Sequence, residues 1–189
     1  MSYAETLILD IVPGKVPQVA AVLSAVSGMG DWVTEIGHLK RITLLRLSDT
    51  VQELLESRAV ILAALPHEFL LRSDVTSWRV LSPVMPAGAY GSVYEWRCYE
   101  SKTYGMANTG RLFMDALPAR LEHSSLLCVL VSLEGTPRFA HLWPSADLND
   151  RASARANAVV SGQWPPKIAG FLNNMENEIL LPLANSIWR

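Results

Sequence analysis

The sequence predicts an α+β protein in which two similar β-α-β-β-α-β halves close one sheet-lined barrel. Three observations predict this. The same order of strand-like and helix-like segments occurs twice, a proline-rich segment separates the two occurrences, and part of one half aligns with the other without a gap. Half of the 189 residues are hydrophobic and 18% are charged, so the chain has enough apolar side chains for a substantial core.

The first half alternates between two hydrophobic patterns. Short apolar runs rich in β-prone residues indicate strands, and apolar residues spaced three or four positions apart indicate helices. In chain order we expect a strand at Thr6–Ile11, a helix at Pro17–Ser27, a hairpin of Trp32–Ile36 and Arg41–Leu47, a helix at Val51–Leu65, and an interrupted strand at Phe69–Leu71 and Ser77–Leu81.

A linker and a second half follow. Residues Pro83–Gly88 include two prolines and a glycine, which mark a connection, so we expect one domain over residues 1–86 and another over 90–189. In the second we expect strands at Val93–Tyr99, Leu126–Leu133, Phe139–Trp143 and Glu178–Leu183, and helices at Thr109–His123, kinked at Pro118, and Asp147–Val160. Arg41–Arg58 aligns with Arg138–Arg155 at an offset of 97 residues, and a duplication is the simple explanation.

A unit with this order folds as a ferredoxin-like antiparallel sheet with both helices on one face. The opposite face is left bare, and a bare apolar sheet face must be covered. Two tandem units can cover each other, sheet against sheet, as a barrel. We expect the interior of that barrel to be the ligand cavity.

The strand at Val93–Tyr99 separates polar from apolar side chains. Because strand side chains alternate between faces, one face holds Glu95, Arg97 and Tyr99 and the other holds Tyr94, Trp96 and Cys98. We expect the apolar set to pack on the helices and the polar set to face the barrel interior, where an ion pair would hold the tyrosine hydroxyl near a ligand. The alternative is a structural ion pair at the barrel rim.

A histidine with two aromatic neighbours occupies the strand at Phe139–Trp143. Phe139, His141 and Trp143 share one face of it. His141 is a candidate general base, with Arg97 as the group that stabilises a developing oxyanion. Phe139 and Trp143 are candidate ligand-binding residues. The alternatives for His141 are a hydrogen-bonded core histidine or a ligand of a metal or haem.

Other chemical signals are weak. Asp147, Arg151 and Arg155 lie at four-residue spacing, which predicts an exposed helical charge ladder, or alternatively a phosphate contact. Cys98 and Cys128 lie in strand-like runs, and we expect buried, reduced thiols. The sequence contains no spacing of ligands typical of a zinc site and no glycine-rich phosphate loop.

The second half resembles a known family. It carries Tyr94–Tyr99, His141–Pro144, Leu148, Arg151–Arg155, Trp164 and Glu178–Pro182. From Val93 to Trp188 this combination is similar to the NIPSNAP family. The first half departs from the pattern, with Leu44 in place of His141 and Arg46 in place of Trp143. The resemblance implies a dimeric α/β-barrel fold of the ferredoxin-like type, whose superfamily includes cofactor-free monooxygenases, isomerases, dehydratases and haem enzymes.

Three functions are compatible with these features. The first is a NIPSNAP-like protein that binds a small apolar or aromatic molecule in the barrel, with Glu95, Arg97, Tyr99 and His141 as polar anchors and cofactor-free acid/base or oxygenase chemistry as an extension. The second is a non-catalytic, oligomerising interaction module, which a barrel filled by side chains would favour. The third is a haem protein with His141 as the proximal ligand.

The remaining expectations concern partners and location. The net charge is −2 and the basic residues are scattered, so a nucleic-acid partner is not expected. No segment reaches the about 18 consecutive apolar residues of a membrane span, and Met1–Asp10 carries two acids and no base, unlike a secretory signal. We therefore expect a complete, cytoplasmic, unprocessed protein that forms a homo-oligomer and uses no cofactor.

Overall fold

The computed structural model describes residues 2–26 and 28–189, so Ser27, the expected end of the first helix, lies outside the described residues. The first half contains β1 (Tyr3–Ile11), α1 (Val16–Leu23), β2 (Gly30–Ile36), β3 (Arg41–Ser48), α2 (Val51–Ala64) and β4 (Leu70–Val80). The second contains β5 (Val93–Ser101), α3 (Met106–Leu121), β6 (Cys128–Ser132), β7 (Arg138–Ser145), α4 (Leu148–Val160) and β8 (Leu172–Pro182). The predicted order is confirmed, and Pro118 lies inside α3 as expected.

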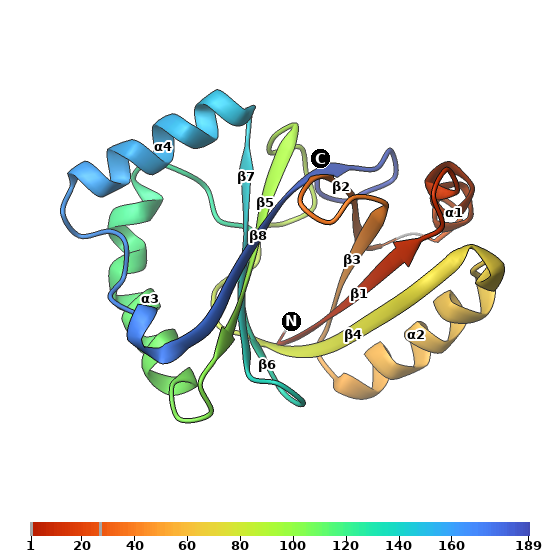
Figure 1. Cartoon of the computed structure of the whole chain (residues 1–189), viewed down its shortest axis with the longest axis horizontal. Coiled ribbons are helices and arrows are strands. Elements are labelled where there is room, and N and C mark those ends of the chain that lie inside the picture. Colours follow the sequence, from red (N-terminus) through yellow and green to blue (C-terminus); the bar gives the residue numbers. More distant parts are fainter. Residues whose placement is uncertain (1, 27) are drawn as a thin grey trace.

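The strands close into one antiparallel barrel in the order β1-β3-β2-β8-β5-β7-β6-β4. Each half supplies four consecutive strands of this circle, and the halves join where β2 pairs with β8 and β4 pairs with β6. Helices α1 and α2 lie outside the barrel on one side and α3 and α4 on the other (Figure 1). The predicted α+β barrel of ferredoxin-like repeats is therefore confirmed.

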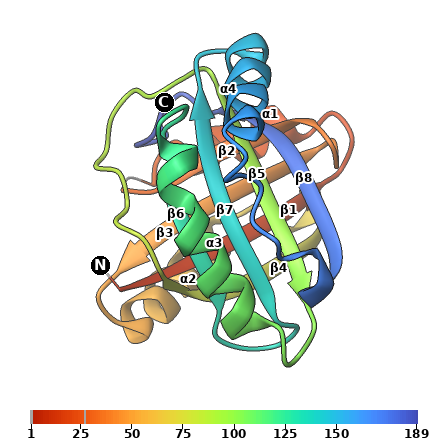
Figure 2. The same cartoon turned by 90° about the vertical axis from the view of Figure 1, so that its left-hand side faces the viewer.

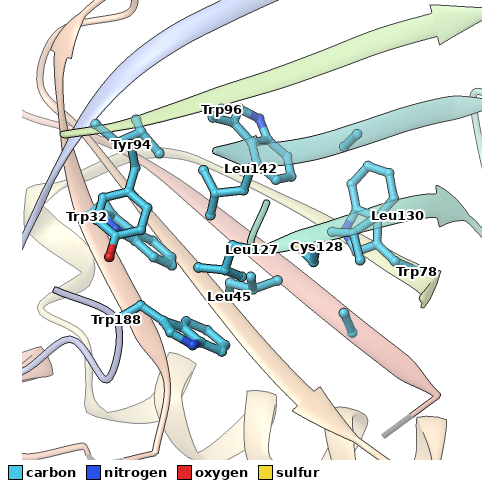
Figure 3. Close-up of a cluster of buried hydrophobic side chains, with 13 residues drawn as sticks. Trp32, Leu45, Trp78, Tyr94, Trp96, Leu127, Cys128, Leu130, Leu142 and Trp188 are labelled. Atoms are coloured by element: carbon cyan, nitrogen blue, oxygen red, sulfur yellow. The ribbon is translucent and has the colours of Figure 1, made fainter. Parts of the chain in front are cut away.

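The inner surface of the barrel is packed with large apolar side chains drawn from both halves (Figure 3). Trp32 lies 5.4 Å from Tyr94 between ring centroids, and Trp78 lies 6.2 Å from Trp96. The predicted facing of β5 is therefore wrong. The apolar set fills the barrel, and the polar set that includes Glu95 faces the helices. Alternation separates the two faces of a strand but does not say which face points inward.

Two strands depart most from their predicted bounds. β4 runs without interruption, and β8 begins at Leu172 instead of Glu178. The added part of β8 is polar, but its backbone pairs with β5, with Met175 opposite Tyr99. Several polar side chains of β4 and β8 line one mouth of the barrel, where Arg138 binds Asp74 at 3.1 Å. Interstrand pairing therefore overrides the weak local strand pattern.

The last residues of the second half return to the first half. The backbone N–H of Leu183 donates to Asp31 O at 2.9 Å, and that of Ile187 donates to Met29 O at 3.1 Å. The Trp188 ring stacks on Trp32 with centroids 6.0 Å apart. Each half thus completes the core of the other.

Two further expectations concern thiols and membranes. Both cysteines are free thiols; Cys128 is buried and Cys98 is partly buried. Burial raises the pKa of the Cys98 thiol to about 12, so this thiol stays protonated at neutral pH. Among the described residues, no helix combines the length and the apolar character needed to cross a membrane.

Candidate functional site

A pocket of about 180 Å³ lies between the outer face of the second half's sheet and the helices that cover it. Figure 2 shows α3 and α4 on this outer side of β5 and β7. Five of the six predicted site residues line the pocket: Glu95, Arg97, Tyr99, His141 and Trp143. The sequence therefore grouped these side chains correctly but placed them inside the barrel instead of beneath the helices.

The pairing of β5 with β7 brings these residues together. The register places Glu95 opposite Trp143, Arg97 opposite His141 and Tyr99 opposite Phe139. The sixth predicted residue, Phe139, lies behind the lining, with its ring 5.8 Å from that of His141 and 4.9 Å from that of Phe113.

Glu95 is buried at the polar end of the pocket and binds three arginines. Its carboxylate accepts hydrogen bonds from Arg151 at 2.6 Å, Arg97 at 2.9 Å and Arg155 at 3.0 Å. Burial alone would raise the pKa of Glu95, but the Arg151 hydrogen bond and the neighbouring guanidinium charges bring it below its ordinary value. The carboxylate is therefore ionised at neutral pH. The expected exposed ladder on α4 is wrong for Arg151 and Arg155, which turn toward this carboxylate, while Asp147 caps the helix.

Arg97 also reaches the tyrosine that the sequence placed beside it. Its Nε donates to the Tyr99 hydroxyl oxygen. Burial raises the pKa of Tyr99 despite the Arg97 charge, so the phenol keeps its proton. Because the oxygen accepts from Arg97, the hydroxyl proton of Tyr99 remains available to a third group.

His141 is 1% exposed and is held by its neighbour Trp143. The indole Nε1–H of Trp143 donates to His141 Nδ1. Burial, reinforced by the charges of Arg97, Arg120 and Arg155, lowers the pKa of His141 well below its ordinary value. The ring is therefore neutral, and because Nδ1 accepts a hydrogen bond, the proton is assigned to Nε2. Nε2 is buried and has no hydrogen-bond partner among the described residues.

Arg120 is a part of the site that the sequence analysis missed. It is 4% exposed, its Nη1 donates to Ala154 O at 2.8 Å, and its guanidinium carbon lies 5.0 Å from the Trp143 ring centroid and 5.9 Å from that of Trp164. Burial, followed by the charge of Arg155, lowers the pKa of Arg120 to about 10, which leaves it charged at neutral pH.

The other lining residues that were missed are mostly apolar; the exception is Arg155, which binds Glu95. They come from α3, α4, the segment after α4 and β8: Phe113, Arg155, Trp164, Pro165, Pro166, Ile168, Ala169 and Met175. The sequence could have indicated that Phe113 and Arg120 lie together, because they are seven residues apart in α3 and therefore share a helical face. Trp164 lies in an irregular segment, where no period indicates which way a side chain points.

The pocket does not fit a haem group. Its volume of about 180 Å³ lies below the range of about 300–1,000 Å³ typical of ligand pockets. Because His141 Nδ1 accepts a hydrogen bond from Trp143, the ring proton lies on Nε2, and neither nitrogen has a free lone pair for iron. Within residues 2–26 and 28–189, no cluster of three or more His, Cys, Asp or Glu side chains is arranged to hold a metal ion.

The fold and the pocket define a single-chain α/β barrel of two ferredoxin-like halves, with a polar pocket beneath the helices of the second half. The NIPSNAP family model matches residues 94–187. The C-terminal half therefore contains a NIPSNAP domain. A search of curated proteins found no match.

Solved structures support the same architecture. A protein described as a "putative monooxygenase" from Fusobacterium nucleatum is 7% identical with a TM-score of 0.71, over 97% of this chain and 93% of that one. An anthrone oxidase-like protein is 9% identical with a TM-score of 0.66, over 96% and 91%. A NIPSNAP domain protein from Burkholderia xenovorans is 23% identical with a TM-score of 0.45, over 49% and 95%. The first two likenesses show the fold alone.

Proposed function

We propose that the protein binds a small, single-ring aromatic molecule in the pocket of its NIPSNAP domain. The observation that carries this proposal is the pocket of about 180 Å³, in which aromatic side chains meet convergent polar groups, whereas the apolar part of the barrel interior around Trp32 and Trp78 is filled. An engineered cavity of about 150 Å³ is known to hold benzene, so one ring is an appropriate size.

The test is a binding measurement with a pocket-filling variant. Single-ring compounds, neutral and anionic, are titrated against the protein and followed by NMR. Ile168→Phe adds a ring at a buried lining position and should abolish binding while keeping the melting temperature. Lys167→Ala is the matched control, because Lys167 is exposed and does not line the pocket. The proposal fails when no compound binds, or when binding survives in Ile168→Phe.

Cofactor-free acid/base or oxygenase chemistry in the same pocket is the second candidate. Two proteins of this fold carry names that describe monooxygenase or oxidase activity, and Arg97 and His141 lie opposite each other where an oxyanion could bind. With Nδ1 occupied by Trp143, His141 supports a role as donor more readily than as base. Oxygen uptake with ring compounds and no added cofactor tests this candidate, and uptake that persists in His141→Leu excludes His141 from it.

The interaction-module alternative makes a different prediction. The barrel interior is filled in its apolar part, as that alternative expected, and assembly into homo-oligomers stays a prediction. Native mass spectrometry of freshly purified protein measures the number of subunits and detects any small molecule that copurifies. An oligomer without a bound molecule, together with failed titrations, would favour the module.

A further inference from the structure

The polar side chains around the pocket present hydrogen-bond donors. Arg97 and Arg120 have no acceptor atoms, the Tyr99 hydroxyl has its proton to give, and the buried Nε2–H of His141 has no partner among the described residues. Glu95 is the one carboxylate among the lining residues, and three arginines already occupy it. A ligand that satisfies this lining must bring acceptors.

The pocket also carries excess positive charge. Arg97, Arg151 and Arg155 share the single negative charge of Glu95. Arg120 lies buried at the same end, and in the part of the chain that the structure describes it forms no ion pair with a carboxylate. A buried charge without a counter-charge is costly, and its lowered pKa of about 10 is consistent with that cost. An anion in the pocket would offset it.

Aromatic rings packed edge to face form another wall of the pocket. Phe113 lies 5.4 Å from Trp164 between ring centroids, and Trp143 lies 6.0 Å from Trp164. Both tryptophans line the pocket beside Pro165 and Pro166. Such a wall packs well against an aromatic ring. The donors and the rings, which meet at Arg120 and His141, therefore describe an aromatic molecule with an anionic group.

We propose that the ligand is a small aromatic carboxylate, with its ring against Phe113, Trp143 and Trp164 and its carboxylate facing Arg97, Arg120 and the His141 Nε2–H. This inference rests on the proposed function, because it assigns the chemical class of the molecule bound there. A carboxylate takes several donors at once, and charge-assisted hydrogen bonds to arginine are the strong ones.

The experiment compares two probes of nearly equal shape. Benzoate and benzamide are titrated against the full chain by NMR at neutral pH. The expected result is that benzoate binds at least about tenfold more tightly, corresponding to about 1.4 kcal/mol. Benzamide binding as tightly as benzoate, or more tightly, overturns the carboxylate inference and leaves the proposed function standing. Failure of both probes overturns the carboxylate inference, and the proposed function is overturned as well when every other single-ring compound also fails to bind.

A substitution then tests whether Arg120 is the residue that binds the carboxylate of benzoate. Arg120→Met replaces the guanidinium that lies over Trp143 with an apolar side chain and removes the buried charge, so the fold should be retained. Benzoate affinity should fall about tenfold, with benzamide affinity within about twofold of the unmodified protein. Arg111→Met on the same helix is the control, since Arg111 is exposed and pairs with Asp115 at 3.2 Å. Equal losses for the two probes, or the same benzoate loss in the control, would contradict the assignment.

Should Arg120→Met unfold, His141→Leu serves as the second variant. It removes the unpartnered Nε2–H and should weaken benzoate binding severalfold. Full benzoate affinity in this variant contradicts the placement of the carboxylate.

Discussion

The two halves place a carboxylate at the same position of the fold and surround it differently. Glu5 lies in β1 opposite Arg46 of β3, and Glu95 lies in β5 opposite Trp143 of β7. Arg46 binds Glu5 directly, and Arg58 lies 3.2 Å from it. Since Arg155 of the second half aligns with Arg58, a buried carboxylate held by this helix arginine is common to both halves, which indicates that it supports the fold.

The pKa values of the two carboxylates move in opposite directions. Burial raises the pKa of Glu5, and the charges of Arg46 and Arg58 only partly oppose that rise. The pKa of Glu95 is lowered, because three arginines outweigh its burial. The added arginines, rather than the carboxylate itself, therefore distinguish the second half.

The neighbouring positions sharpen the contrast. Where β5 and β7 place Arg97 opposite His141, β1 and β3 place Leu7 opposite Leu44. Both leucines are fully buried in an apolar cluster with α1 and α2. The first half therefore packs with leucine the region where the second half keeps donors and a pocket. These polar groups are the reason why the proposed ligand site is assigned to the second half.

The largest effect is expected when the carboxylate that both halves share is removed from each half in turn. Glu95→Gln should lower the free energy of unfolding by about 3 kcal/mol, because Arg97 and Arg151 lose a buried counter-charge. Glu5→Gln should cost about 1 kcal/mol or less, because Arg46 keeps the Leu54 carbonyl at 3.0 Å and Ser57 as acceptors. Urea unfolding measures both, and equal losses would show that the extra arginines do not matter.

A smaller effect is expected when one residue of the second half is replaced by the residue at the matching position of the first half. His141→Leu introduces the residue found at Leu44 and leaves the Trp143 indole N–H without its acceptor. We expect a loss of about 1–3 kcal/mol in unfolding free energy, together with weaker ligand binding. Arg111→Met serves again as the control. A stability loss with unchanged binding would make His141 a structural residue only.

The sequence predicted the parts of this comparison that depend on local patterns. The order of strands and helices and the grouping of Arg97 with His141 follow from short-range periodicity. Local patterns did not predict which face of β5 points into the barrel, because both faces carry large side chains. The contact that decides it joins Arg151 to Glu95 across 56 positions of the chain. Arg120 and Trp164 were missed for the same reason: helix α3 and the irregular segment after α4 meet only in the folded protein.

The last prediction uses the opposite pKa shifts. For Glu95 the folded pKa lies below the unfolded one, so its stabilisation is present above the unfolded pKa and is lost as the pH falls through the folded pKa. For Glu5 the folded pKa lies above the unfolded one, so the folded protein holds that proton more tightly and loses stability as the pH rises through this window. The two halves should therefore respond to pH with opposite signs.

Unfolding free energies of the unmodified protein, Glu5→Gln and Glu95→Gln between about pH 2.5 and pH 7 test this, since that range extends to both sides of the ordinary glutamate pKa of about 4.3. The difference between the unmodified protein and Glu95→Gln should grow as the pH rises. The difference from Glu5→Gln should move the other way, because ionised Glu5 is the less favourable form in the folded protein. Curves with the same sign would mean that Arg46 and Arg58 stabilise ionised Glu5 as effectively as three arginines stabilise Glu95, and the electrostatic distinction between the halves would be lost.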